Sequence, residues 1–215
     1  MESAALVEEL TASVADFCKG LDAQPPAYSY IPCTSDEQRA AVMKSRLFNE
    51  QRAAELYGTW LRTTPEFEVR ALMARSAHEE MNHAELLAER IRGLGQDPFD
   101  YRPLPAQTAM FNALEGLDGT CQRIAGFPLA GETVATYLIR MSLAAPSVPE
   151  WIKEPYRRIT EDEERHGSVP ETVLTRYATT PERQDAARRA VAMRLVLFRE
   201  YLASLDRWGL EGAAW

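Results

Sequence analysis

The hydrophobic residues of the chain recur every three or four positions over long stretches, which is the pattern of amphipathic helices. The sequence has no extended period-two alternation bounded by turn residues, the pattern that predicts strands. Capping residues, glycines and prolines divide the chain into helical segments. These segments are 1–20, 36–63, 65–93, 106–146 with an interruption at 126–128, 150–166 and 181–209. The pattern predicts an all-α fold with four long core helices and additional N-terminal and C-terminal helices.

Two of the predicted helix starts carry clear signals. Ser35 and Gln38 form a capping box, so a helix should begin at residue 36. Thr64 and Pro65 are typical of an N-cap residue followed by a proline at the first helical position. The next helix should therefore begin at residue 65.

Proline-rich stretches indicate where the chain connects its parts. Residues 21–34 hold three prolines and are expected to form a linker, and residues 97–105 also hold three and should connect two helices. We therefore predict two parts. Residues 1–34 would form an N-terminal helix and linker arm, and residues 35–215 would form the helical bundle.

One carboxylate interrupts the apolar stripe of each core helix, and in two helices a histidine follows three positions later. Residues at i and i+3 share a helix face, so each Glu-x-x-His pair should point inward. Charges that face a bundle core are costly unless they are paired or bind a metal, and four convergent carboxylates would repel one another. Two divalent cations would neutralise this set, which predicts a di-metal site. The six residues are Glu50, Glu80, His83, Glu132, Glu163 and His166.

The spacing of these residues is nearly the same in the two halves of the chain. Glu50 and Glu80 are 30 positions apart (80 − 50), and Glu132 and Glu163 are 31 apart (163 − 132). With this pattern the chain resembles the ferritin-like di-iron carboxylate superfamily, in its oxygenase and oxidase branch, over roughly residues 36–205. The resemblance implies a ferritin-like four-helix bundle that binds two iron ions, with a manganese–iron pair as the alternative.

The resemblance also implies how the ligands divide between the two metals. Each metal would take one histidine and share the bridging or chelating carboxylates with the other. The set would comprise bridging or chelating Glu80 and Glu163, terminal Glu50 and Glu132, and the histidines His83 and His166.

Two further acidic residues are expected to support the histidines. Residues 162–166 are similar to the Asp-Glu-x-Arg-His segment of bacterial di-iron hydroxylases, in which the aspartate holds the opposite histidine. Asp162 is therefore expected to orient His83, and Glu79 occupies the corresponding position in the other half. His78 should lie away from the metal face, because it is five residues from His83.

The choice among the activities of this superfamily depends on the surroundings of the ligands. The chain lacks the Cys-x-x-Cys pairs of rubredoxin-like peroxidases, and it has Leu87 where radical-generating subunits carry a tyrosine. Thr136 lies one turn after Glu132, where di-iron hydroxylases commonly carry a threonine that can hydrogen-bond a bound oxygen species. Thr136 is thus a candidate catalytic residue, and the alternative is a hydroxyl bonded to a backbone carbonyl. The expected apolar lining is Leu47, Phe48, Ala54, Met73, Leu87, Leu129, Ile139 and Ile159.

We therefore predict an oxidoreductase, an O₂-dependent non-haem di-iron oxygenase or oxidase that hydroxylates or otherwise oxidises a small, partly apolar organic substrate. O₂ would be the co-substrate, and a ferredoxin or a reductase would donate electrons. The alternatives are a ferroxidase or another iron-handling ferritin-like protein, and a helical interaction protein with a relict site.

The charge and the cysteine content limit the partners and the cellular compartment that we expect. The chain has 32 acidic and 24 basic residues, a net charge of −8, so neither nucleic acid nor an anionic membrane is expected as a partner. No apolar run is long enough to span a membrane. Three isolated cysteines form neither a disulfide framework nor a zinc motif, which favours the cytoplasm. A homodimer is compatible with the sequence.

Overall fold

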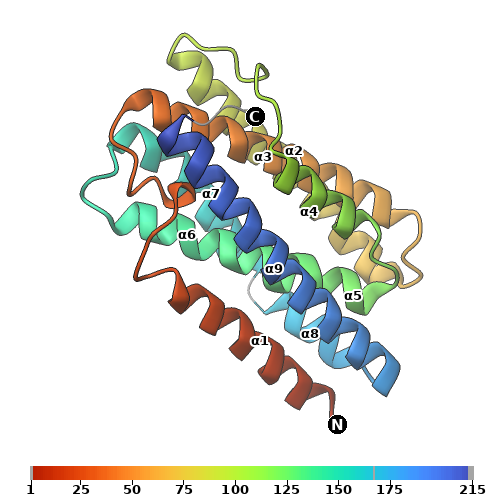
Figure 1. The fold of residues 1–215 in the computed structure, drawn as a ribbon. Helices are drawn as coiled ribbons and strands as arrows, with labels where there is room; N and C mark the ends of the chain where they lie inside the picture. The colour runs from red at the N-terminus through yellow and green to blue at the C-terminus, as the bar shows by residue number, and fades with distance from the viewer. Residues whose placement is uncertain (1, 167, 213–215) are drawn as a thin grey trace.

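The computed structural model describes residues 2–166 and 168–212, with the backbone alone at residues 164–166. This part of the chain is all-helical and contains no strand, as predicted (Figure 1). Element η1 is a 3-10 turn and η2 is a π-helical segment. The elements are α1 (Ser3–Gly20), η1 (Ala27–Ser29), α2 (Asp36–Leu61), α3 (Phe67–Gly93), α4 (Pro105–Glu115), α5 (Thr120–Ile124), η2 (Ala125–Glu132), α6 (Thr133–Ala144), α7 (Glu150–His166), α8 (Val169–Tyr177) and α9 (Pro181–Glu211).

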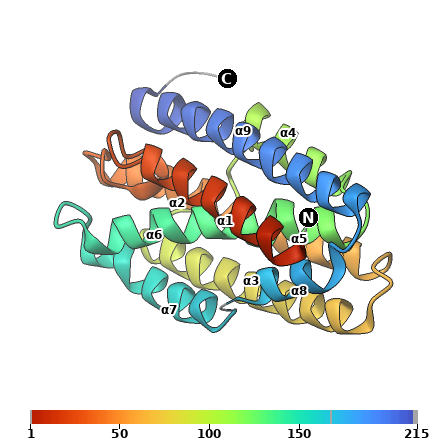
Figure 2. The ribbon, with the colours of Figure 1, turned by 90° about the horizontal axis from the view of Figure 1, so that it is seen from below.

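Two helix pairs hold the predicted ligands, with Glu132 at the end of η2 directly before α6. Helix α2 lies along α3, and α6 lies along α7, with α3 and α7 in contact between the pairs (Figures 1 and 2). Helix α9 crosses over η2, α5 and α4, and α1 packs on α8 and α9. The residues between these elements form a continuous hydrophobic core. One side of the bundle is therefore covered by helices that lie outside the two ligand-bearing pairs.

The start of α2 confirms the predicted capping box. The hydroxyl of Ser35 accepts a hydrogen bond from the backbone N–H of Gln38 at 3.3 Å, and the Gln38 side chain accepts one from the Ser35 N–H at 3.4 Å. Two backbone donors at the helix start are satisfied in this way. This cap fixes the register of α2, the helix that carries Glu50.

The predicted start of α3 at residue 65 is wrong. The helix begins at Phe67, with Glu66 as its N-cap residue. The Thr64 hydroxyl is not free to cap it, because it donates to the Trp60 carbonyl at 2.9 Å and accepts from Arg123 at 3.0 Å. Thr64 thus closes the end of α2 instead of opening α3.

The predicted interruption at 126–128 is also wrong, because the chain breaks earlier and continues helically there. The break follows α4 and ends at Gly119, whose φ of 76° lies in the left-handed region. Residues 125–132 then form the π-helical η2, which tolerates Pro128 inside it. Such wide turns are rare and occur mostly as local features of helices, often at functional sites. In this chain the segment ends at Glu132, one of the predicted ligands.

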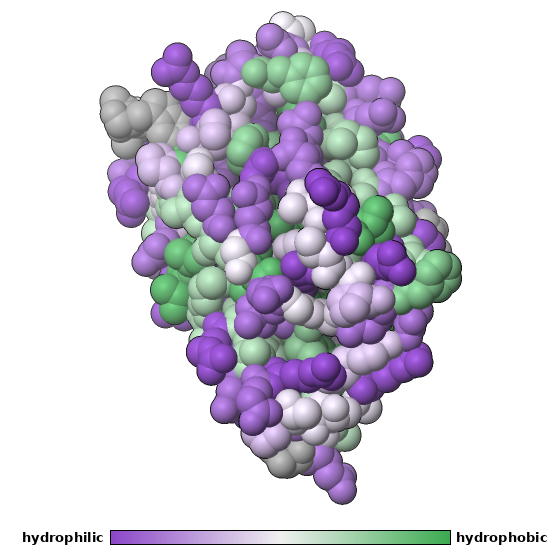
Figure 3. Space-filling view, turned by 90° about the vertical axis from the view of Figure 1, so that its right-hand side faces the viewer, coloured by the Kyte–Doolittle hydropathy of each residue, from purple (hydrophilic) through white to green (hydrophobic). Residues whose placement is uncertain are grey.

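The apolar residues of the described helices do not form a membrane-spanning segment. None of the helices in the described ranges is long and apolar enough to cross a bilayer. Figure 3 shows hydrophilic and hydrophobic residues intermixed over one face of the molecule.

Candidate metal centre

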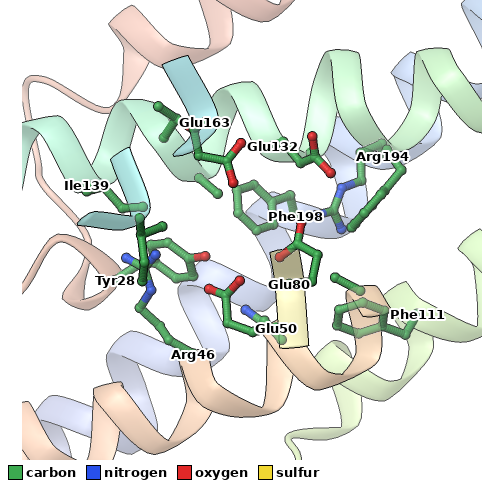
Figure 4. A pocket seen from close by; sticks show the side chains of 17 residues that line it. Tyr28, Arg46, Glu50, Glu80, Phe111, Glu132, Ile139, Glu163, Arg194 and Phe198 are labelled. Atoms are coloured by element: carbon green, nitrogen blue, oxygen red, sulfur yellow. The ribbon is translucent and has the colours of Figure 1, made fainter. Parts of the chain in front are cut away.

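Four of the predicted carboxylates meet in one cavity between the helices. Glu50 comes from α2, Glu80 from α3, Glu132 from the end of η2 and Glu163 from α7, and all four line the cavity. Figure 4 shows their carboxylate groups turned toward a common space. The cavity has a volume of about 50 Å³. That is room for roughly four water molecules, so the site suits small ions and compact ligands.

His83 brings an imidazole to the same place. Its side chain is fully buried, and its Nδ1 atom lies 3.9 Å from Glu50 Oε2, 3.7 Å from Glu80 Oε2 and 3.9 Å from Glu163 Oε1. None of these separations is a hydrogen bond. Nδ1 has no hydrogen-bond partner among the described residues, although it is buried. A buried ring nitrogen surrounded by carboxylate oxygens at such distances requires an explanation.

The other ring nitrogen of His83 is held by the residue expected to orient it. Its Nε2 atom lies 3.2 Å from Asp162 Oδ2. Asp162 accepts the Nε2–H in this arrangement, which leaves Nδ1 as the nitrogen with a free lone pair. A histidine that binds a metal characteristically donates its other N–H to such a carboxylate.

The electrostatics of the cavity are unfavourable without a cation. Burial raises the pKa of the Glu80 carboxyl well above its usual range, and the three neighbouring carboxylates raise it further. The fully buried Tyr57 hydroxyl donates a hydrogen bond to Glu132 Oε1. Burial, followed by the charge of Glu132, raises the pKa of Tyr57 well above its usual range, so this phenol stays protonated and acts as a donor.

The donor set fits divalent metal ions. Two donors that each lie about 2.1 Å from one ion are at most about 4.2 Å apart, and the 3.7–3.9 Å separations around His83 Nδ1 fall within this bound. Glu50, Glu80 and His83 each offer a ligand atom within 4.8 Å of the others. Carboxylates combined with imidazole suit iron or manganese. The unpartnered Nδ1 is the atom that such an ion would satisfy.

The remaining predicted residues are placed as follows. Helix α7 ends at His166, but the side chain of His166 lies outside the described residues. Glu79, expected to support it, is half-buried on α3. His78 is exposed and contacts Asn82 at 3.3 Å, away from the cavity.

The walls of the cavity differ from the expected lining. Thr136 lines it, as do Ile139 and Ile159. The other expected apolar residues do not line it, and their place is taken by four aromatic residues, of which all but Phe127 come from segments that carry no predicted ligand. These aromatic residues are Tyr28, Phe111, Phe127 and Phe198. The periodicity of a single helix identifies its buried face but not which other segment covers that face, so no sequence signal pointed to this wall.

Two buried arginines also line the cavity, and the sequence pattern did not identify them. Arg46 lies between the rings of Tyr28 and Tyr156, with its guanidinium carbon 4.2 Å and 4.3 Å from their centroids. Arg194 lies 4.6 Å from the Phe198 centroid and beside Glu132 (Figure 4). In the sequence they are two among many arginines of polar helices, and nothing in their spacing marks them.

Comparison with known proteins assigns the fold alone. No protein-family model matches the chain, and no curated protein matches it. A protein domain of unknown function with a heme oxygenase-like fold from Shewanella denitrificans is 15% identical, with a TM-score of 0.76 over 96% of each chain. A CADD-like protein of unknown function from Nostoc punctiforme is 14% identical, with a TM-score of 0.58 over 95% of this chain and 98% of that one. The chain thus has the all-helical architecture of proteins with a heme oxygenase-like fold, and it carries a candidate Glu/His metal site.

Proposed function

We propose that the protein is an O₂-dependent non-haem di-iron oxygenase or oxidase that acts on a small, partly apolar organic molecule. The observation that carries the proposal is the buried His83 Nδ1, which has no hydrogen-bond partner in the part of the chain that the structure describes and lies 3.7–3.9 Å from three carboxylates. A bound metal pair would explain this arrangement, whereas packing alone does not.

The residues of the chain would divide the work of holding that pair. Glu50, Glu80 and His83 would hold one metal, Glu132 and Glu163 would extend the set toward the second, and His166 would complete it. Asp162 fixes the ring of His83 and leaves Nδ1 as the donor atom. Two bound ferrous ions would supply electrons for the reduction of O₂.

The surroundings of the ligands would bind the substrate and exclude water. The aromatic wall keeps bulk water away from the four carboxylates and offers apolar contacts to an organic molecule. The Thr136 side chain lines the cavity one turn beyond Glu132, where its hydroxyl would be available to donate a hydrogen bond to a ligand held there. A ferredoxin or a reductase would return the electrons consumed in each turnover.

The proposal is tested by metal loading of matched histidine variants. The purified chain, loaded anaerobically with iron, should hold about two irons per chain, as the ligand set implies. His83→Ala should lose at least one of them, and the ferrous protein should no longer consume O₂ rapidly. His78→Ala removes an exposed histidine from the same helix and should leave the iron content unchanged. Full iron content in His83→Ala would contradict the proposal.

A further inference from the structure

The Arg194 guanidinium is buried at the cavity wall with unused donors. The residue is 4% exposed, and its Nε and Nη1 atoms have no hydrogen-bond partner among the described residues. Burial lowers the pKa of Arg194 to about 10, so the group stays charged at neutral pH. A buried guanidinium with unsatisfied N–H groups is costly, and its contact with the Phe198 ring and the nearby charge of Glu132 offset only part of that cost. The protein thus keeps a cation with free N–H groups next to the candidate metal centre.

A glycine makes room for this guanidinium. A Cβ atom placed on Gly131 would lie 2.7 Å from Arg194 Nε and 2.8 Å from Nη2, closer than such contacts are found. Gly131 directly precedes Glu132, so the guanidinium reaches the cavity through space that any other residue at this position would fill. The backbone of η2 and the side chain from α9 therefore fit together around Arg194.

Arg46, the other buried arginine of the cavity wall, also has Nε and Nη1 atoms without a hydrogen-bond partner among the described residues, but its guanidinium is less accessible to a ligand. Both faces of its guanidinium are covered by tyrosine rings, at 4.2 Å and 4.3 Å. It also lies one turn before Glu50 on the same helix. Arg194 is covered closely by one ring, Phe198, and is the better candidate for an incoming anion.

We propose that Arg194 binds the carboxylate of the substrate, so that the substrate is a compact organic monocarboxylate with an apolar body. The planar guanidinium matches a carboxylate with two parallel hydrogen bonds. Phe111, Phe127 and Ile139 would pack on the apolar part. The cavity of about 50 Å³ requires a compact molecule. A single charge is favoured over a phosphate dianion, because the bound group lies near Glu132.

This inference rests on the proposed function, because it takes the bound molecule to be a substrate, but its test does not require turnover. Acetate and propionate are titrated into the full chain, both metal-free and loaded with redox-inert zinc, and compared with acetamide and propionamide by calorimetry. The carboxylates should bind about tenfold or more tightly than the amides of the same shape, since a charge-assisted pair replaces a neutral one.

Three variants locate the effect. Arg194→Gln should abolish the preference for carboxylate over amide, and its zinc stoichiometry should match that of the wild type. Gly131→Ala should weaken carboxylate binding by displacing the guanidinium. Arg123→Gln is the matched control, because Arg123 is equally buried but bonds to Leu117 and Thr64 away from the cavity. It should lower the thermal midpoint and retain the preference.

The outcomes separate this inference from the proposed function. An equal affinity for amide and carboxylate, a preference that survives Arg194→Gln, or tighter binding of inorganic phosphate would overturn it. Loss of zinc in Arg194→Gln would also overturn it, since Arg194 would then act by holding Glu132. A wild-type chain that binds no metal but prefers carboxylates would contradict the proposed function and support the anion-binding role of Arg194. Stoichiometric metal without carboxylate preference would support the proposed function and contradict the anion-binding role of Arg194.

Discussion

At the scale of single residues, the candidate site contains charged and polar groups whose burial does not stabilise the fold. Within the described residues, His83 has one ring nitrogen without a hydrogen bond, and Arg194 has two guanidinium nitrogens without a partner. Glu80 is buried among other carboxylates. Each of these groups is costly in a closed helical core, and each faces the same cavity. Their convergence indicates that this region was shaped for ligands at some expense of stability.

Tyr57 offers a test at this scale. Its hydroxyl donates to Glu132, so Tyr57→Phe removes a hydrogen bond from a candidate metal ligand without opening a large gap. We expect the variant to fold and to bind metal about 10–100-fold more weakly, the usual effect of losing a group that orients a ligand. Tyr137→Phe is the control, because its hydroxyl donates to Asp22 outside the cavity. Zinc titration with a competing chelator measures both, and equal affinities would contradict the assignment of Glu132.

At the scale of elements, the π-helical η2 decides where Glu132 points. Deletion of Ala130 would restore a tighter helix and turn Glu132 and α6 by about 100° relative to the preceding segment. We expect the variant to keep its helical circular dichroism but to lose part of its metal binding, because Glu132 leaves the cavity. Deletion of Ser147, an exposed residue between α6 and α7, should leave metal binding intact. Unchanged stoichiometry after the first deletion would remove Glu132 from the ligand set.

Local sequence signals predicted the elements that local interactions determine. The capping box at Ser35 marks the start of α2 correctly, since its hydrogen bonds lie within three residues. The last helix begins at residue 181, as predicted, and Thr180 caps it through Arg183. The signal at Thr64 is misleading because Trp60 and Arg123 bind its hydroxyl, and Arg123 lies far away in the sequence. Pro128 predicts a break, but the π-helical segment and its packing on α9 accommodate the proline. In both cases, packing against other parts of the chain outweighs the local preference of the residue, which is Thr64 in the first case and Pro128 in the second.

Helix periodicity predicted which helix faces carry the ligands of the candidate site, but not which residues cover those faces. Spacing placed Glu50, Glu80 and His83 on inward faces, and the structure brings them together. It could not identify Arg194 or the aromatic wall, because these come from segments whose position depends on how the whole chain packs. Ligands within one helix pair are thus easier to predict than the residues that cover them.

At the scale of the whole molecule, the cavity should make metal-free stability depend on pH. The folded pKa of Glu80 is raised, so between the unfolded value near 4.5 and the folded value the native state binds more protons than the unfolded chain. The free energy of unfolding of the metal-free protein should therefore fall as pH rises above about 5 toward the folded pKa of Glu80. Glu9, Glu68 and Glu150 have lowered pKa values, and their contributions are already complete above about pH 5.

Urea unfolding at several pH values measures this dependence. Glu80→Gln should flatten it, because the amide carries no charge to bury. Saturating zinc should also flatten it and raise stability, since the metal binds the native carboxylates. A metal-free protein that becomes more stable over this pH range would show that Glu80 is not buried among charges.

The aromatic wall has a consequence for how such a protein can diverge. The carboxylates and His83 lie on α2, α3, η2 and α7, whereas three of the four wall aromatics come from the 21–34 connection, α4 and α9. Under the proposed function, the metal ligands and the residues that select the substrate would be encoded on different stretches of the gene. Substitutions in the second group would then change which molecule is accepted while the candidate metal ligands are kept.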